Sequence, residues 1–196
     1  MQTNSKNSNG ARRVFLVHGW EGTPNNHWFP WLTWELKARG FEVNALTMPH
    51  ADAPKVSEWV ATIKDAVGRS NADTYFVGHS LGCVAVVRYI VQLPKTARVG
   101  GCVFVAGFLS SLGIPEVEDF VSTPLDIEKV KSHCPKFVTI FSDNDSYISM
   151  EKSLEFSKAL GAKAILERGK GHLTKREGVE ALSSVYKSVL DMSAGG

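Results

Sequence analysis

The chain has 196 residues, 43% of them hydrophobic, and its 22 basic residues nearly balance 20 acidic ones. This length and apolar content suffice for one hydrophobic core, so we expect a single domain over residues 13–192. The net charge is +2 and both signs are spread along the chain, which excludes the basic footprint of a nucleic-acid-binding protein.

The beginning of the chain is polar and rich in Asn and Ser, so residues 1–12 are expected to form a flexible lead-in. It lacks the apolar stretch of a secretory signal, and no apolar run of the sequence approaches the length of a membrane span. The three cysteines form no disulfide pattern, and Cys83 and Cys102 fall in apolar runs. We therefore expect a cytoplasmic protein that has no membrane partner.

Short apolar runs alternate with longer amphipathic ones. The short runs are rich in Val, Ile and Phe without strict alternation, which is typical of strands buried on both faces. The longer runs have helical periodicity; in residues 56–67 the apolar side chains recur on one face. Strands are expected at 14–17, 41–46, 74–77, 102–105, 136–141 and 162–166, and helices at 31–39, 56–67, 81–93, 124–133, 149–160 and 178–190.

This alternation predicts right-handed βαβ units in an α/β fold of three layers. About six mainly parallel strands would form the middle layer, with helices on both faces. In such sheets, ligands bind at the carboxyl ends of the strands. Candidate functional residues are therefore those that directly follow a predicted strand.

A Gly-His-Ser-Leu-Gly run, from Gly78 to Gly82, lies between a predicted strand and a predicted helix. A G-x-S-x-G pattern in this position is typical of a nucleophile elbow, in which a sharp turn exposes the serine. Glycines on either side avoid steric clashes in so tight a turn, and the following helix N-terminus favours negative charge. Ser80 is therefore the candidate nucleophile.

A serine hydroxyl needs an adjacent base, which is usually a histidine oriented by a carboxylate. In enzymes with this elbow the chain order is serine, acid, histidine. Of six histidines, only His172 lies after the fifth and sixth predicted strands. The loop after the fifth strand offers two acids, Asp143 and Asp145. Asp143 is well placed for a local turn, so the pattern favours Asp145 without excluding Asp143.

An oxyanion hole needs two backbone N–H donors. We expect them from Leu81, directly after the nucleophile, and from Trp20, in the loop after the first strand. Trp31 and Trp34, three residues apart, are expected in the core. Residues near strand ends that we expect to contact substrate are His18, Trp28, Phe108 and Tyr147.

Metal and cofactor motifs are lacking in the sequence. It has no H-E-x-x-H pair, no paired cysteines at zinc-binding spacing and no carboxylate cluster. Neither G-x-G-x-x-G nor a Walker A lysine pattern occurs. We expect neither a metal nor a cofactor.

Several of these segments together resemble the small α/β-hydrolases related to retinoblastoma-binding protein nine. The resemblance covers residues 14–190, including the spacing of Trp28, Trp31 and Glu35-Leu36 in the first predicted helix. The other matching segments are Val17-His18-Gly19-Trp20, Met48-Pro49, Gly78-His79-Ser80, Asp145-Ser146-Tyr147-Ile148 and Gly171-His172.

The resemblance implies a compact serine hydrolase of the α/β-hydrolase fold with little or no cap domain. It places the catalytic triad on Ser80, Asp145 and His172, and strengthens the case for Asp145 over Asp143. The family's aspartate is commonly followed by Pro, whereas Ser146 follows here. The L-x-C-x-E element linked to the retinoblastoma name is absent, so no partner of that kind is implied.

We therefore expect a serine hydrolase that cleaves small carboxylic esters, or thioesters or amides, through an acyl-enzyme on Ser80. Its partner would be a small-molecule acyl substrate. Two alternatives remain: an acyltransferase that uses the same triad, and a catalytically silent α/β-hydrolase fold that serves as a protein-interaction module. The complete order of serine, acid and histidine argues against the silent module.

Overall fold

The computed structural model describes residues 11–194, which form a six-stranded parallel sheet of order β2-β1-β3-β4-β5-β6. The strands are β1 (Arg13–Val17), β2 (Glu42–Ala45), β3 (Thr74–His79), β4 (Gly101–Val105), β5 (Phe137–Phe141) and β6 (Lys163–Leu166). The helices are α1 (Phe29–Ala38), α2 (Val56–Val67), α3 (Leu81–Ile90), α4 (Pro115–Glu118), α5 (Ile127–His133), α6 (Met150–Leu160) and α7 (Ser183–Ala194), with a short 3-10 helix, η1 (Lys175–Glu177).

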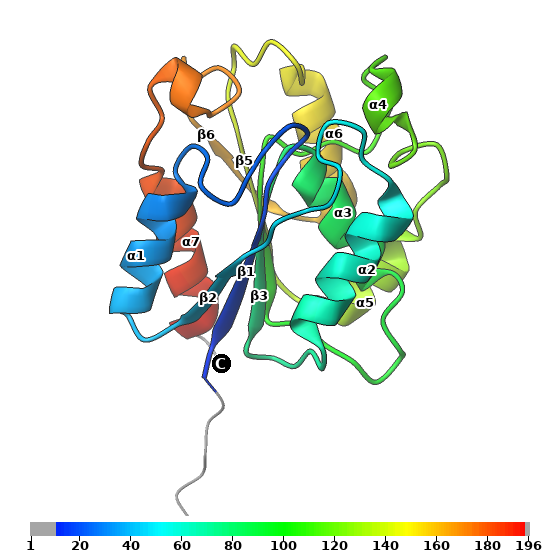
Figure 1. Ribbon diagram of the computed structural model, residues 1–196, viewed down its shortest axis with the longest axis vertical. Helices are drawn as coiled ribbons and strands as arrows, with labels where there is room; N and C mark the ends of the chain where they lie inside the picture. The colour runs from blue at the N-terminus through cyan, green and yellow to red at the C-terminus, as the bar shows by residue number, and fades with distance from the viewer. Residues whose placement is uncertain (1–10, 195–196) are drawn as a thin grey trace, which may run out of the picture.

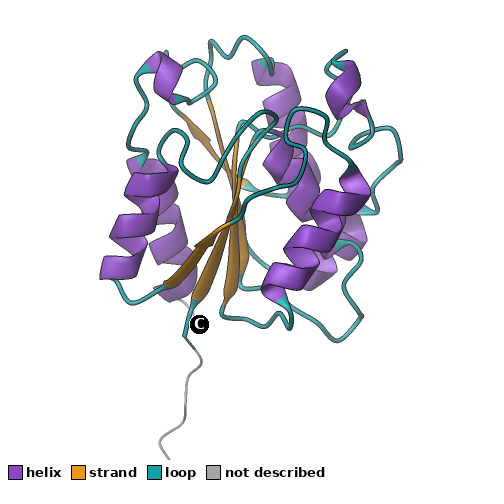
Figure 2. Cartoon of the chain, in the orientation of Figure 1, coloured by secondary structure: helices purple, strands orange, loops and turns teal. Residues whose placement is uncertain are grey.

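Helices cover both faces of the sheet, as expected. Helices α1 and α7 pack together on one side, to the left in Figure 1, and α2, α3 and α5 lie on the other. Figure 2 shows the strands as the central layer, with the loops after their carboxyl ends gathered along the upper edge. The predicted three-layer α/β-hydrolase fold is confirmed, and no cap domain covers this edge within residues 11–194.

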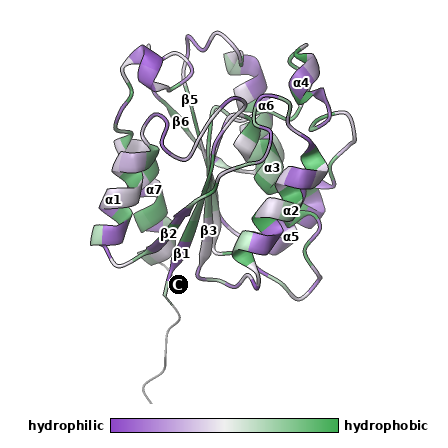
Figure 3. Ribbon diagram, in the orientation of Figure 1, coloured by the Kyte–Doolittle hydropathy of each residue, from purple (hydrophilic) through white to green (hydrophobic). Residues whose placement is uncertain are grey.

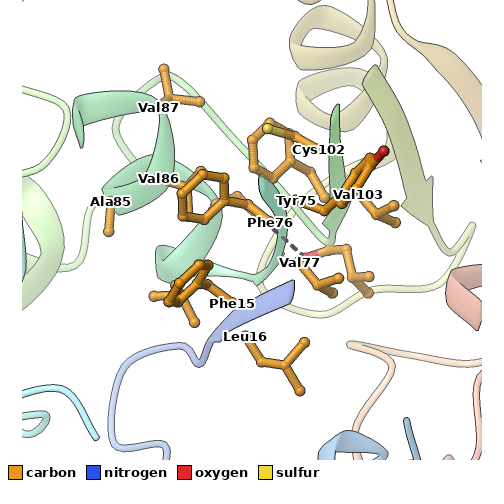
Figure 4. Packing of buried hydrophobic residues seen from close by; sticks show 14 of the residues in the cluster. Phe15, Leu16, Tyr75, Phe76, Val77, Ala85, Val86, Val87, Cys102 and Val103 are labelled. Atoms are coloured by element: carbon orange, nitrogen blue, oxygen red, sulfur yellow. Dashed lines mark hydrogen bonds between the residues drawn. The ribbon is translucent and has the colours of Figure 1, made fainter. Parts of the chain in front are cut away.

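The core lies in the middle of the sheet and along α3. All residues of β3 and β4 are buried, and so is every residue of α3, which explains why that helix reads as almost wholly apolar. Hydrophobic residues accordingly concentrate on the central strands in Figure 3. The rings of Phe15 and Phe76 lie 5.7 Å apart beneath this helix (Figure 4). Burying one such ring contributes about 2 kcal/mol to stability.

Two expectations about helices were wrong. The final helix begins at Ser183 and not at residue 178, because Gly178 has a φ of 78° and ends η1. Trp34 is 68% exposed, whereas Leu32 and Leu36 are buried. Helical spacing puts residue 34 on the face opposite residues 32 and 36, so only one of those two faces can meet the sheet.

Residues 1–10 of the expected lead-in lie outside the described residues. Arg12, at its end, is held in place: its carbonyl accepts the N–H of Glu42, and its guanidinium lies 4.5 Å from the ring centroid of Phe41. Over residues 11–194, no helix combines the length and apolarity needed to cross a membrane.

The connection between β4 and β5 is anchored by one buried cation. Arg88, on α3, donates from Nε to the carbonyl of Phe120 at 2.9 Å and from its terminal nitrogen to the carbonyl of Thr123. Asp119 of the same connection accepts the N–H of Val56, at the start of α2. The segment over the upper edge is thus tied to the rigid layer beneath it.

We expect Arg88→Met to lower the free energy of unfolding by about 2 kcal/mol, because both carbonyls lose a charged donor. Urea denaturation followed by circular dichroism measures this change. The matched control is Lys187→Met, on an exposed position of α7, which should change stability by less than about 0.5 kcal/mol. Equal effects of the two substitutions would contradict the anchoring role.

Candidate active site

Ser80 lies in a strained turn between β3 and α3. Its backbone has φ 53° and ψ −120°, a conformation that few residues with a side chain adopt. The turn is held by its own N–H, which donates to the carbonyl of Val105 on β4 at 2.8 Å. This strand–turn–helix geometry is that of a nucleophile elbow, and it presents Ser80 at the carboxyl edge of the sheet.

The glycines around Ser80 are required by close approach. A Cβ on Gly82 would lie 2.1 Å from the carbonyl oxygen of Val17, and one on Gly78 would lie 2.8 Å from Cys83. A Cβ on Gly19, in the β1–α1 loop, would come within 3.0 Å of the Ser80 Cβ. The elbow and the β1–α1 loop therefore pack directly against each other.

His172 and Asp145 form a buried pair beside this turn. Nδ1 of His172 lies 2.8 Å from Oδ2 of Asp145, and the side chains are only 10% and 2% exposed. The other carboxylate oxygen of Asp145 accepts the N–H groups of Tyr147 and Ile148. Both oxygens are thus bonded, which fixes the carboxylate and, through it, the orientation of the imidazole.

Asp143 has a different role in the loop. Its carboxylate accepts the N–H of Gly169 at 2.7 Å and forms an exposed ion pair with Arg168. The Gly169 N–H holds the pKa of Asp143 below its usual value, with the charge of Arg168 as a further cause. Of the two candidate acids, the structure therefore brings Asp145, and not Asp143, to His172.

Two backbone N–H groups beside Ser80 have no protein acceptor. Leu81 is the first residue of α3, and Trp20 lies in the adjoining β1–α1 loop. Neither N–H donates a hydrogen bond to another of residues 11–194. The next residue, Glu21, does donate, to the carbonyl of Ala51. The two free donors lie where an oxyanion hole is expected.

Ser80 and His172 line one cleft of about 490 Å³ at this edge. Of the residues expected to contact substrate, Phe108 and Tyr147 line it, as does Trp20. The cleft also has an apolar side that the sequence did not predict, made by Leu112, Ile114 and Val117 of the β4–β5 connection.

His18 and Trp28 do not line the cleft. His18 is buried; its Nδ1–H donates to the carbonyl of Gly19, and its Nε2 accepts the N–H of Met48. Trp28 is wholly buried and donates from Nε1 to the carbonyl of Leu173. Both side chains hold the loops that carry the site.

His27 and His79 were not predicted as site residues. His79 is buried and bonds through Nε2 to the carbonyl of His172 at 3.0 Å, so the elbow directly supports the loop of His172. Burial, followed by the charge of His172, lowers the pKa of His79 well below 6.5. His27 lines the cleft with φ 55°, and Nδ1 accepts the N–H of Lys175. These contacts join segments far apart in sequence, so no local pattern reveals them.

Metal-binding clusters do not occur in the described part of the chain: no group of three His, Cys, Asp or Glu side chains there could hold an ion. The elbow, the buried acid–imidazole pair and the two free amides instead define the architecture of an α/β-hydrolase with a serine at its active edge.

Comparison with known proteins agrees with this class. The Serine hydrolase family model matches residues 14–191, so the chain belongs to the serine hydrolase family. The YdeN protein of Bacillus subtilis (strain 168) is 30% identical over 177 residues, which cover 90% of this chain and 93% of YdeN. The crystal structure of the ydeN gene product superposes with a TM-score of 0.91 at 29% identity, covering 94% of this chain and all of that one.

A mammalian relative extends the comparison. Serine hydrolase RBBP9 of Rattus norvegicus is 28% identical over 185 residues, which cover 93% of this chain and 91% of that protein. The fold alone is shared with Est1E of Butyrivibrio proteoclasticus, whose TM-score is 0.73 at 15% identity over 96% of this chain and 90% of that one. The resemblance inferred from the sequence motifs is confirmed, and the protein is a hydrolase.

Buried neutral histidines make stability sensitive to acid. Burial lowers the pKa of His18, because desolvation disfavours its charged form. A proton on Nε2 would also face the N–H of Met48, which donates to that nitrogen. The unfolded chain protonates histidine near pH 6.5, so the unfolded state binds more protons below that pH. The free energy of unfolding should therefore fall as the pH drops from about 7 to 5.5.

Urea denaturation across this pH range measures the effect in the wild type and in His18→Asn. Asn cannot bind the proton that His18 takes up only in the unfolded state. The free energy of unfolding of the variant should therefore fall less steeply with decreasing pH, by up to about 1.4 kcal/mol per pH unit. Parallel curves for the two proteins would show that His18 does not carry the effect.

Proposed function

We propose that this protein is a serine hydrolase that cleaves small carboxylic esters through an acyl-enzyme on Ser80, with Asp145 and His172 completing a catalytic triad. The bond from Asp145 to His172, which lines the same cleft as the strained Ser80, is the observation that carries the proposal. An ordinary turn needs neither a buried acid–imidazole pair nor a strained serine.

The proposed reaction uses the ring nitrogen of His172 that Asp145 does not bind. Because Nδ1 of His172 is bonded to Asp145, Nε2 is the nitrogen that takes the Ser80 proton as the hydroxyl oxygen attacks the acyl carbon. Asp145 stabilises the imidazolium that forms. His172 then gives the proton to the leaving alcohol, and water repeats the cycle on the acyl-enzyme.

No hydrogen bond joins the Ser80 hydroxyl to His172 among the bonds of residues 11–194. Catalytic hydrogen bonds are often long without substrate and tighten when the reacting complex forms. Ser80 and His172 line the same cleft, where such a bond could form with substrate in place. The oxyanion that results would accept the N–H groups of Leu81 and Trp20.

Small esters fit the dimensions of the cleft. Its volume of about 490 Å³ lies in the lower part of the range for small-molecule sites. The β4–β5 connection, with only the short helices α4 and α5, stands where a cap domain would be inserted. The substrates that this supports are esters with short acyl groups.

A reducing compartment such as the cytoplasm suits the cysteines. All three are free and buried. The sulfur atoms of Cys102 and Cys134 lie 3.6 Å apart without forming a disulfide. Thiols so close together persist where the surroundings keep them reduced.

A fluorophosphonate probe together with a panel of p-nitrophenyl esters tests the proposal. The probe should label the wild type, and Ser80→Ala should abolish both labelling and ester hydrolysis, because no other residue occupies the elbow. Acetate and butyrate esters should be cleaved faster than palmitate. If folded wild-type protein neither reacts with the probe nor cleaves any ester, the proposal fails.

The acid is tested by comparing Asp145→Asn with Asp143→Asn. Loss of the Asp145 charge should lower kcat by about 10⁴-fold, because the imidazole loses its tautomer control and its counter-charge. Asp143→Asn should retain most activity, because that carboxylate holds only Gly169 and Arg168. The reverse order of effects would reassign the acid to Asp143.

A further inference from the structure

The cleft has two unlike sides. Leu112, Ile114 and Val117, from the β4–β5 connection, make one side apolar. The opposite group comes from the β1–α1 loop and from η1, and it includes His27 and Arg176. A substrate that fills the cleft therefore meets hydrocarbon from the β4–β5 connection, and from the other segments it meets both nitrogen donors and the carboxylates of Glu21 and Glu177.

Arg176 is the cation of this cleft that forms no ion pair within residues 11–194. Its neighbour Lys175 forms an ion pair with Glu180 at 3.1 Å. The carboxylate of Glu177 accepts both the N–H and the hydroxyl of Thr174, which hold it in the cap of η1. Arg176 takes part in no ion pair with any of residues 11–194. Its planar guanidinium is free for a carboxylate or a phosphate, which it can bind with two parallel hydrogen bonds.

His27 supplies a second donor beside it. Because Nδ1 accepts the N–H of Lys175, the proton of the neutral ring is on Nε2. Burial, followed by the charge of His172, lowers the pKa of His27; the charge of Glu177 opposes this shift, and the charge of Arg176 adds to it. His27, Arg176 and His172 therefore lie close enough for their charges to interact.

The position of His172 decides which part of an ester meets this group. The proton that His172 takes from Ser80 must pass to the oxygen of the leaving alcohol. That oxygen must lie beside His172, so the alcohol portion extends along the residues next to it. Arg176 follows His172 by four residues and lines the same cleft.

We propose that the preferred substrates are esters whose alcohol portion carries an anionic group, a carboxylate or a phosphate, which Arg176 binds with His27 beside it. The apolar side then receives the acyl group. This inference rests on the proposed function, because it uses His172 as the proton donor. It names Arg176 as the residue that determines specificity for the leaving group.

Glu21 also lines the cleft, forms no ion pair within residues 11–194 and carries the opposite charge. It lies in the β1–α1 loop next to Trp20, and its charge is not among those that shift the pKa of His27. Glu21→Gln is therefore a matched control that removes a charge from the same cleft but not from the group around His172.

The experiment compares kcat/KM for 4-acetoxybenzoate and 4-acetoxyphenyl phosphate with that for neutral methyl 4-acetoxybenzoate. The esters differ in intrinsic reactivity, but this difference cancels when the anionic-to-neutral ratio of a variant is divided by that of the wild type. Arg176→Gln should lower this ratio at least about tenfold, as for loss of a charge-assisted hydrogen bond. The loss should lie mainly in KM, and Arg176→Lys should restore part of it.

Additional substrates and a control variant show where on the ester the anionic group is recognised. The two anionic esters show whether carboxylate or phosphate is preferred. Mono-p-nitrophenyl succinate carries its charge on the acyl side, and p-nitrophenyl butyrate is its neutral counterpart. The ratio of their kcat/KM values should not depend on Arg176. Glu21→Gln should not lower the leaving-group ratio.

An unchanged ratio in Arg176→Gln, or an equal loss in Glu21→Gln, overturns this inference while Ser80-dependent hydrolysis still stands. A dependence on Arg176 only for the succinate ester overturns the assignment to the leaving group. Absence of all Ser80-dependent hydrolysis and of probe labelling overturns the proposed function, and this inference with it.

Discussion

The architecture of the site depends on the close approach of α3 to β1. This approach is possible because Gly82 has no side chain: a Cβ there would lie 2.1 Å from the carbonyl oxygen of Val17. Any larger residue would push the helix away from a close-packed sheet. With the helix in place, Leu81 at its start lines the same cleft as Trp20 of the β1–α1 loop. One steric constraint thus positions Ser80 and both candidate oxyanion donors.

A second constraint joins the remaining part of the site to the same edge. The loop after β5 accepts hydrogen bonds from the backbone of the loop after β6, including Lys170 to Ser142 and Gly171 to Asn144. His172 follows Gly171 directly, so these hydrogen bonds also fix the position of its backbone, independently of the bond from its side chain to Asp145. The Asp-rich sequence of the first loop therefore serves two purposes, of which only the pairing of Asp145 with His172 concerns chemistry.

The sequence predicted what depends on local spacing. The strand–glycine–serine–helix pattern located Ser80, and chain order singled out His172. It could not predict contacts that depend on distant segments. Trp28 follows a strand-end loop and is an aromatic residue of the kind that often lines pockets. Its indole N–H nevertheless donates to the carbonyl of Leu173, 145 residues away. Likewise α4, with four residues, is too short to show a helical period, so the apolar side of the cleft was missed.

In the proposed function, chemistry and specificity reside in different parts of this fold. The elbow and Asp145 follow the buried strands β3 and β5, and a Cβ on Gly78 or Gly82 of the elbow would meet backbone within about 3 Å. Leu112 and Arg176 instead belong to connections that pass over the edge and are held at separate points, such as Arg88. Substitutions in these connections can change what the cleft accepts without moving Ser80. The unpaired charge of Arg176 is consequently better explained by what the site binds than by what the fold requires.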